Sequence, residues 1–483
     1  MSGAQPIDRR LRQVSLLVAG CFFMEFFDGT IVTTAAPRIG AALHVSASDI
    51  GFVITAYLVT LAILIPLSGW LAARLGARPV FLLAIAIFTL ASVACALSTS
   101  LGMLIAMRVL QGAGGAMMVP VGRLTVLASI SRSQLVGVMA FLAWPGLVAP
   151  VIAPLAGGLI TTYANWHWLF LINAPLGAIA FLAAWRLIAS IPGPPPPPLD
   201  RLGVLLTCGG LAGMTYTAQL LAQARTPWLT VALLGPASLA TLAASVRHLR
   251  RTPAPLINLA TLRTRTFAAS IAGSAVFWVV LGSVPFLLPL LFQTVFGWSS
   301  VKSGAVVLAL FAGNFAIKFA TTFMLNRFGF RRTLIGATAG VVAATAAAGV
   351  LVAGTPLVVT VLVVLAGGTL RSIGLTCYST MAFSEIPREQ LRDANTLLAT
   401  NQQLSAGLGI AVSAVLLRVG TRIADVLPGH PGAHAPFTVA FGFLAVIALI
   451  PFAGALRLHP TAGDAVRPAA LARRDAAAAG AQR

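Results

Sequence analysis

Residues 69–78 read GWLAARLGAR and join two apolar runs, 48–68 and 79–97. Each run has about the 20 residues that an α-helix needs to cross the roughly 30 Å hydrocarbon core of a bilayer. The joining stretch is short and carries Arg74 and Arg78. The pattern therefore predicts two membrane-spanning helices joined by a tight basic loop.

Apolar runs of the same kind recur along nearly the whole chain. The 483 residues are 58% hydrophobic and only 9% charged, whereas soluble domains are about 25% charged. Lipid is therefore the expected solvent for most of the surface, and the predicted fold class is an all-α polytopic membrane protein. The fourteen predicted spans are 14–36, 48–68, 79–97, 101–121, 135–161, 167–188, 201–222, 228–246, 267–292, 302–324, 333–353, 357–381, 399–419 and 436–456.

Basic residues set the predicted orientation. The formal net charge is +21, but the cations are nearly all arginines in short loops, which is the positive-inside pattern. No basic face with interleaved aromatics lies outside the apolar runs, so nucleic-acid binding is not expected. With fourteen spans most basic loops fall on one side, including Arg74, Arg78, Arg123, Arg132, Arg327, Arg331 and Arg392. Both termini are therefore predicted to be cytoplasmic, and the other side has only Arg38, Arg225, Lys302, Arg418 and Arg422.

Several other classes are disfavoured. The first run contains Glu25 and Asp28 and has no small-residue cleavage site, which favours a retained helix over a signal peptide. The sequence has no GxxxxGKS or GxxxxGKT phosphate-binding loop and no cluster with metal-site spacing, so no cofactor is expected. Four cysteines inside apolar runs are expected to be small core residues without disulfides: Cys21, Cys95, Cys208 and Cys377.

A proline segment divides the chain. Residues 192–198 read PGPPPPP, which is extended and cannot continue a helix. The predicted organisation is a cytoplasmic N-terminus (1–13), an N-terminal six-helix bundle (14–190), a Pro-rich loop (191–200), two inserted spanning helices (201–246), a basic cytoplasmic loop (247–265), a C-terminal six-helix bundle (266–456) and a disordered cytoplasmic tail (457–483).

The two sets of six spans look related. The letters ARLGAR at 73–78 recur as NRFGFR at 326–331, 253 residues further on. The letters VLQG at 109–112 recur as VLAG at 364–367, 255 residues further on. Two matches at nearly one spacing indicate a duplicated six-helix unit, and duplicated halves with a site between them are a transporter architecture.

Five segments, in order and on the expected helices, carry a family resemblance. They are DGTIVTTAAP at 28–37, GWLAARLGAR at 69–78, RVLQG at 108–112, a Pro/Gly set at 146–158 and WHWLFLINAP at 166–175. Together they resemble the fourteen-span drug:proton antiporters of the major facilitator superfamily, the group of EmrB- and QacA-like exporters, over roughly residues 14–456.

The resemblance implies the major facilitator fold, with two six-helix halves and two extra spanning helices inserted between them, and it ties Asp28 to proton coupling. It also implies gating or structural roles for Gly69, Arg74, Gly76, Arg78, Gln111, Gly112, Gly146, Pro150, Pro154, Gly157 and Gly158.

Three positions depart from the family pattern. Ala73 stands where the loop signature normally has an Asp that helps to latch the inward gate. Ala153 stands where the antiporter motif often has Gly, and His167 replaces the usual Arg. The latch is therefore expected to be weaker than the family's, or different.

Two acids and three bases are predicted inside the spans: Glu25, Asp28, Arg108, Lys318 and Arg371. A charge in hydrocarbon costs about 3 kcal/mol on insertion scales, so such residues are kept when they pair, face water or work. Helical rise places Asp28 and Arg108 roughly 13 and 10 Å from the outer ends of their helices, so the two can pair. A conformational change that breaks the pair would serve proton coupling, with Glu25 on the same helix face; a static ion pair is the alternative.

The second half contributes candidate cavity residues. Arg371 either binds substrate or balances Glu25, and Lys318 either snorkels to the headgroups or shares a polar cavity patch with Asn314. A polar group at the start of the thirteenth span is a candidate lining for the inner vestibule: Asn395, Asn401, Gln402 and Gln403.

The predicted function is proton-driven export of small, largely hydrophobic compounds, such as drugs or toxic metabolites, across a bacterial inner membrane. Two acids against three bases suit a neutral, monovalent or anionic compound better than a multivalent cation. The alternative is the same fold dedicated to one physiological solute: a metabolite, siderophore or lipid. A membrane enzyme or receptor is disfavoured because the loops are too short for a catalytic cluster.

The expected partners are the substrate, protons and the lipid bilayer. A periplasmic adaptor and an outer-membrane channel stay open as partners, although the sequence itself does not indicate them.

Overall fold

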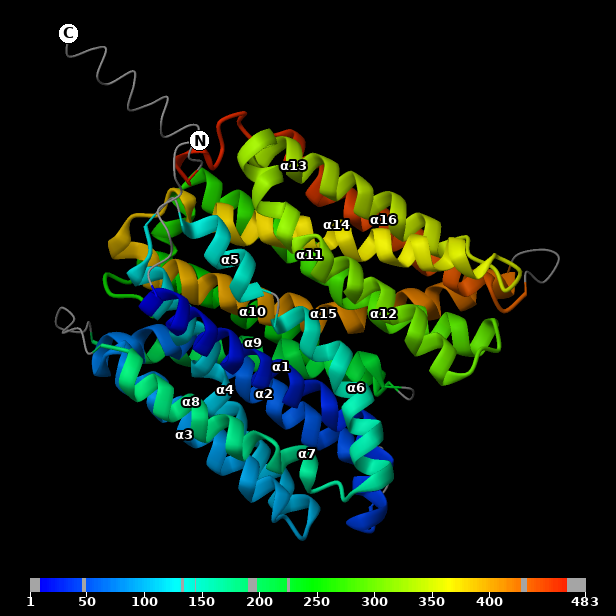
Figure 1. Ribbon diagram of the computed structural model, residues 1–483, viewed down its shortest axis with the longest axis horizontal. Helices are drawn as coiled ribbons and strands as arrows, with labels where there is room; N and C mark the ends of the chain where they lie inside the picture. The colour runs from blue at the N-terminus through cyan, green and yellow to red at the C-terminus, as the bar shows by residue number, and fades with distance from the viewer. Residues whose placement is uncertain are drawn as a thin grey trace.

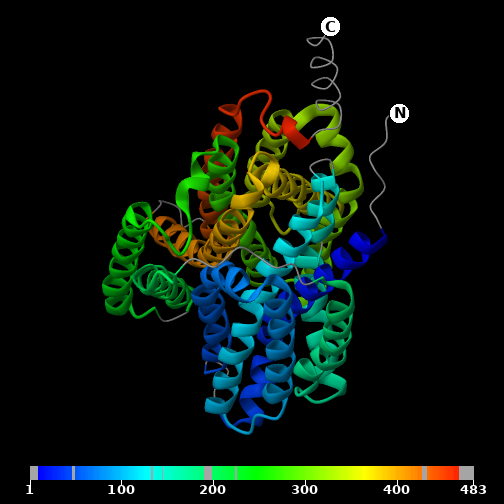
Figure 2. The same cartoon turned by 90° about the vertical axis from the view of Figure 1, so that its left-hand side faces the viewer.

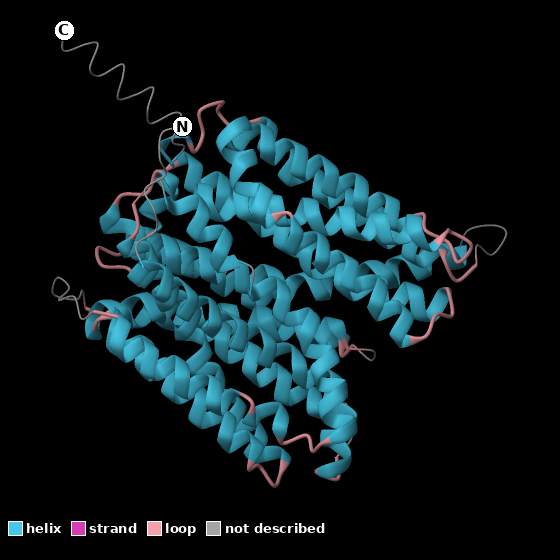
Figure 3. Ribbon diagram, viewed as in Figure 1, coloured by secondary structure: helices cyan, strands magenta, loops and turns pink. Residues whose placement is uncertain are grey.

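The computed structural model describes residues 9–45, 49–131, 134–143, 145–189, 198–223, 226–426 and 432–466. Within these ranges the chain is helical and contains no strand (Figures 1 and 3). The α-helices are α1 (Arg9–Ala42), α2 (Ile50–Leu75), α3 (Ala77–Ala96), α4 (Leu101–Ser129), α5 (Leu135–Ala143), α6 (Pro145–Tyr163), α7 (Trp168–Leu171), α8 (Asn173–Leu187), α9 (Arg201–Ala222), α10 (Trp228–Arg251), α11 (Arg265–Leu290), α12 (Ser300–Ala316), α13 (Lys318–Gly349), α14 (Leu357–Ser384), α15 (Leu391–Val426) and α16 (Ala435–Leu456). The short elements are η2 (Leu259–Arg263), η3 (Leu291–Val295), η4 (Arg388–Gln390) and η5 (Asp464–Val466).

The helices fit a polytopic membrane protein. Among the described residues, 11 helices are long and apolar enough to cross a membrane, and a bent pair, Lys302–Ala316 and Ala320–Gly349, makes up to 12. Each of the fourteen predicted ranges overlaps one or two helices. The predicted fifth span lies on α5 and α6, and the tenth and eleventh lie on α12 and α13, whose backbone is non-helical at Gly329.

The helices form two sets and a peripheral pair. We call α1–α8 the N-terminal set, α11–α16 the C-terminal set, and α9 with α10 the inserted pair. α9 packs against α2 and α15, whereas α10 packs against α9 and η2, so the inserted pair lies at the side of the molecule (Figure 2). The end of the bundle where α1 begins and α16 ends is called the terminal end; the other is the opposite end (Figure 1).

The repeated basic loop has the same geometry in both sets. Gly76 and Gly329 have φ angles of 89° and 80°, a region that glycine enters without steric cost. Arg78 Nη2 donates to the carbonyl of Trp185 in α8 at 2.8 Å, and Arg331 Nη2 donates to that of Leu456 in α16 at 3.0 Å. In each set the second arginine thus ties the loop to the last helix, as a duplicated unit should.

The two sets share one core, and α6 of the N-terminal set also packs on α12 of the C-terminal set. One cluster of buried side chains, which includes Ile31, Leu104 and Phe170, belongs to the N-terminal set alone and lies at the opposite end. A second cluster contains residues of both sets, such as Met139 of α5 and Met381 of α14. Helix contacts agree: α5 packs on α13 and α14, while α2 and α4 pack on α15.

Three predictions about loops and ends need adjustment or fall outside the description. Arg123 was expected in the loop after the fourth span, but α4 continues to Ser129 and buries it. The predicted disorder is wrong for residues 457–466, because Ala462 and Val466 are buried and the Gly463 amide donates to Glu385; residues 467–483 lie outside the described residues. Arg132 and residues 190–197 of the Pro-rich loop lie outside the described residues.

Candidate functional site

A fully buried ion pair joins α1 to α4. Asp28 accepts hydrogen bonds from Arg108 Nη1 at 2.5 Å, Gln111 Nε2 at 2.9 Å and Asn173 Nδ2 at 2.9 Å. Neither Asp28 nor Arg108 is exposed. The pairing that matched depths allowed is therefore present, and α8 completes it through Asn173. Both carboxylate oxygens are occupied, so a proton can reach Asp28 only after this arrangement opens.

The groups around the pair hold it in place. Gln111 accepts from Arg108 Nη1 at 2.6 Å and donates to Ser92 Oγ of α3 at 2.5 Å. The Arg108 guanidinium lies 4.2 Å from the centre of the Tyr57 ring, a cation–π distance. A buried ion pair offsets its desolvation only with such additional partners. Gln111, predicted as a structural motif residue, is thus part of the charged site.

Glu25 lies outside this hydrogen-bonded group. It is 8% exposed, and its Oε2 has no hydrogen-bond partner among the described residues. A Cβ at Gly115 would lie 3.6 Å from Glu25 Cγ and 3.2 Å from Tyr57 Oη, so Glu25 and Tyr57 face the bare backbone of α4. The carboxylate interacts electrostatically with Arg123 of α4. Of the two acids, Glu25 is therefore the one with a free oxygen in this conformation.

Arg123 connects this region to the C-terminal set. Its Nη1 and Nη2 each donate to Gln402 Oε1 of α15 at 3.3 Å. A second tie is close by, where Asn395 Nδ2 donates to the carbonyl of Pro120 at 2.8 Å. Asn401 instead donates to Ser274 Oγ of α11. The residues predicted to line a vestibule thus include helix-to-helix ties.

Arg371 of α14 is a buried cation without an acidic partner among the described residues. Its Nη2 donates to the carbonyl of Leu281 in α11, which is free because Pro285, four residues on, has no N–H. Its Nε and Nη1 have no partner. The adjoining cavity, between α11, α12, α13 and α14, is only about 20 Å³, enough for one water.

Lys318 points inward, not toward the headgroups. It begins α13 and its Nζ donates to Thr376 Oγ1 of α14 at 2.6 Å. Thr376 donates to the carbonyl of Ser372, and Ser372 Oγ donates to the carbonyl of Asn314 in α12. Asn314 Oδ1 has no partner in the described part of the chain. The structure thus places Lys318 and Asn314 in one polar group and leaves Arg371 one turn away on α14.

Motif residues lie where helices approach closely. A Cβ at Gly112 would lie 2.9 Å from Thr60 Cβ and 3.0 Å from the Tyr57 carbonyl, and one at Gly69 would overlap Thr396 of α15. Gly146, Pro150, Pro154, Gly157 and Gly158 lie in α6, which packs against α1; the side chains of Pro150 and Pro154 lie outside the description.

The missing acid at position 73 leaves a basic cavity at the terminal end. Ala73 lines a space of about 630 Å³ together with Arg10, Arg78, Gln134 and Arg392. Arg74 is exposed in the last turn of α2. The ties from α4 to α15 join the two sets near this end.

Sequence reasoning missed Tyr57, Ser92, Arg123 and Asn173. Asn173 is a polar residue inside an apolar run and within a quoted motif, so it carried a usable signal. Ser92 and Tyr57 did not, because single hydroxyls are ordinary in spanning helices. Arg123 was hidden because a basic residue near a span end is normally assigned to a loop.

A duplicated helical loop, repeated sets of spanning helices and ionisable residues buried within both sets define a polytopic membrane transporter. The family model described as Major Facilitator Superfamily matches residues 18–410. The chain therefore belongs to the major facilitator superfamily, and it is a transporter rather than an enzyme.

Two relatives are similar to this chain over nearly its whole length. The chain is 37% identical over 463 residues to a Cronobacter sakazakii protein named "Putative multidrug resistance protein MdtD", covering 95% of this chain and 96% of that protein. A Pectobacterium atrosepticum protein of the same name is 33% identical, with 95% and 97% covered.

Among solved structures, the human organic anion transporter MFSD10 has a TM-score of 0.64 at 16% identity, with 92% of this chain and 99% of that chain covered. The proton:xylose symporter XylE has a TM-score of 0.63 at 12% identity, with 94% and 97% covered. At these identities the likeness concerns the fold alone.

Proposed function

We propose that this protein is a proton-coupled exporter of small, largely hydrophobic compounds. The observation that carries the proposal is the pair of acids on α1: Asp28 with both oxygens bonded, and Glu25 one turn away with a free oxygen. Both acids are buried; Asp28 is held by hydrogen bonds on both oxygens, whereas Glu25 has an oxygen with no partner among the described residues, and in this proposal that oxygen takes up the proton first. The names of the relatives, which are multidrug resistance proteins, support export.

In this proposal Glu25 receives the proton first. A neutral Glu25 no longer attracts Arg123, whose guanidinium also holds Gln402 of α15. The tie between the two sets then changes its geometry, and the sets move apart at the terminal end. This opening exposes the Asp28–Arg108 pair. When Asp28 separates from Arg108, the proton moves from Glu25 to Asp28.

The shared core and the α4–α15 ties support assigning this conformation to a state closed at the terminal end. Arg10, Arg78 and Arg392 gather at that end, so we propose that it faces the cytoplasm and that both termini are cytoplasmic in a bacterial inner membrane. The protein would then be in its outward-facing state. We also propose that α1–α8 and α11–α16 are the two moving bundles, with α9 and α10 as the inserted pair.

The C-terminal set supports a proposal about substrate charge. Lys318 and Arg371 lie in its interior with no acidic partner among the described residues. A multivalent cation would meet repulsion there, whereas a neutral compound or a carboxylate would not. The same observation supports the alternative of one dedicated anionic solute. A resistance screen in an efflux-deficient host separates the two functions: an exporter of many hydrophobic compounds protects against many of them, whereas a transporter of one solute protects against none or one.

The experiment is efflux from proteoliposomes with an imposed pH gradient and a panel of cationic, neutral and anionic compounds. Wild type should transport, and Glu25→Gln and the paired variant D28N/R108Q should each lose at least tenfold of the gradient-driven rate. The paired variant removes both charges and so avoids leaving Arg108 buried alone. Arg38→Gln, at an exposed position on α1, is the matched control. Full gradient-driven efflux by D28N/R108Q contradicts the proposal.

A further inference from the structure

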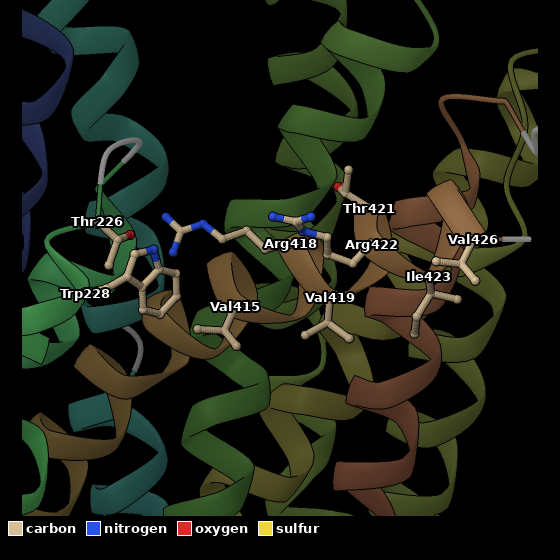
Figure 4. A pocket seen from close by; sticks show the side chains of 9 residues that line it. All are labelled: Thr226, Trp228, Val415, Arg418, Val419, Thr421, Arg422, Ile423 and Val426. Carbon is tan, nitrogen blue, oxygen red and sulfur yellow. The ribbon is translucent and has the colours of Figure 1, made fainter. Parts of the chain in front are cut away.

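A cavity at the opposite end lies between the inserted pair and α15. It has a volume of about 770 Å³ and is lined by Trp228 at the start of α10 and by one face of the last turns of α15. Figure 4 shows Arg418 extending from α15 toward Trp228, with Arg422 one turn further along the same helix. Transport as proposed above uses none of these residues.

Two arginines at this end run against the charge pattern of the chain. Only five basic residues were assigned to this side of the membrane, and two of them, Arg418 and Arg422, line this one cavity. Residues four apart lie on the same helix face. Cations on the side opposite the basic loops oppose the positive-inside preference, and none of the salt bridges among the described residues involves either arginine.

The guanidinium of Arg418 is incompletely satisfied. Its Nη2 donates to the carbonyl of Gln223 at 2.5 Å, and its Cζ lies 5.7 Å from the centre of the Trp228 ring. Its Nη1 is shielded from solvent and has no partner in the described part of the chain. Asp425 is exposed on the same helix, but no described hydrogen bond joins it to either arginine.

Thr226 and Thr421 add two hydroxyl groups to the lining, and the rest of it is apolar. Val415, Val419 and Ile423 follow the helix face beside the arginines, and Val426 is 85% exposed. Trp228 is 60% exposed, and tryptophan at the end of a spanning helix is typical of the level of the headgroups. The cavity therefore offers two cations at headgroup level and an aliphatic strip that runs toward the membrane interior.

From these observations we infer that this cavity binds an anionic phospholipid, with its phosphate between Arg418 and Arg422 and its acyl chain along the valines of α15. Guanidinium groups bind phosphate oxygens with two parallel hydrogen bonds. The lipid would bridge α15 of the C-terminal set and α10 of the inserted pair, which gives the inserted pair a role as one wall of a lipid site. A free anion would use the arginines but not the valines.

The test measures lipid binding to delipidated full-length protein in a neutral detergent, by native mass spectrometry and by the shift in melting temperature. Three probes are titrated: dioleoylphosphatidylglycerol, dioleoylglycerol and inorganic phosphate. Wild type should bind phosphatidylglycerol and not the other two. R418Q/R422Q should weaken binding about thirtyfold, and Arg422→Gln alone about fivefold, since each cation near a membrane surface contributes similarly.

Controls separate the site from general charge effects. Lys302→Gln removes another cation at the same end, which lies 4.1 Å from the Trp298 ring but lines no described cavity with it, and should leave binding unchanged. R418K/R422K keeps the charge but loses the paired guanidinium hydrogen bonds, so its binding should fall between that of wild type and that of R418Q/R422Q. Should R418Q/R422Q unfold, Arg422→Gln, at an exposed position, carries the test. The proposal is overturned if R418Q/R422Q or Arg422→Gln binds phosphatidylglycerol within twofold of wild type, or if wild type binds dioleoylglycerol equally well. Saturable binding of inorganic phosphate that depends on the arginines would overturn it in favour of a free anion.

Discussion

The two six-helix sets use the same scaffold but bury different charges: acids together with arginines in the N-terminal set, and cations without a described acidic partner in the C-terminal set. Both have a positive-φ glycine in the basic loop, and in both the second arginine binds a carbonyl of the last helix. In the N-terminal set a buried arginine binds the Asp28 carboxylate; in the C-terminal set a buried arginine binds the Leu281 carbonyl and has no acidic partner among the described residues. At the repeat spacing of 253 residues, Leu281 occupies the position of Asp28.

The comparison separates scaffold from function. The duplicated features are the basic loop and the hydrogen bond from its second arginine to the last helix. They serve packing in each set. The acids of α1 and the cations of α13 and α14 are not duplicated. Through these residues the two sets can differ in function. We therefore propose that proton movement belongs to the N-terminal set and substrate contact to the C-terminal set.

The largest expected effect is on the buried pair. Asp28→Asn leaves Arg108 buried without an acid and should lower stability by about 3–5 kcal/mol, while D28N/R108Q should recover much of the loss. Arg371→Met removes a cation that has no acid partner, so stability should stay equal or rise. Thermal unfolding can be followed with a thiol-reactive dye, because all four cysteines are buried in the folded protein. A loss for Arg371→Met as large as that for Asp28→Asn would erase the contrast between the sets.

The repeated VLxG motif allows a matched pair of glycine variants. Gly112→Ala places a Cβ 2.9 Å from Thr60 Cβ and should cost about 1–3 kcal/mol. At its repeat partner Gly367 the nearest atom, Ala344 Cβ, would be 3.6 Å away, so Gly367→Ala should change stability by no more than about 0.5 kcal/mol. Melting temperatures of the two variants decide this, and equal losses would show that the two halves pack alike here.

The hydrogen bond from the second loop arginine to the last helix should contribute equally to stability in the two sets. Arg78→Gln and Arg331→Gln each lose one charge-assisted bond to a carbonyl at an exposed site, and each should cost about 1 kcal/mol. The same melting assay measures both, with Arg74→Gln on the exposed end of α2 as the control. A clear effect in one set only would contradict the scaffold role.

The smallest effect concerns the loop before α9. Burial raises the pKa of the Asp200 carboxyl, but hydrogen bonds from His248 and from the amides of Gly203 and Leu256 outweigh it and lower that pKa below its ordinary value. A depressed folded-state pKa gives stability above the unfolded value near 3.9 that is lost as pH falls through the folded pKa. Between pH 5 and 3, wild type should therefore lose about 1 kcal/mol more than Asp200→Asn; parallel melting curves would contradict this.

Much of the fold followed from sequence because bilayer thickness fixes the length of a spanning helix, and the arginines of the loops mark where one helix ends and the next begins. The Asp28–Arg108 pair was predictable from depth along two helices of known rise. The residues that complete it were not, because Asn173 and Ser92 approach Asp28 only through the packing of α8 and α3. Arg123 and Lys318 show the same limit: a long cation near a span end reaches either a headgroup or a neighbouring helix, and only the tertiary contacts decide.

We propose that proton movement and substrate contact lie in different sets. The most direct measurement is the proton flux that an imposed substrate gradient drives across proteoliposomes containing wild type, D28N/R108Q or Arg371→Met, together with substrate affinity for each. D28N/R108Q should bind substrate within about threefold of wild type and move no protons, and Arg371→Met should bind an anionic substrate about tenfold more weakly while protons still accompany each turnover. Substrate-driven proton flux at the wild-type rate in D28N/R108Q would contradict the account.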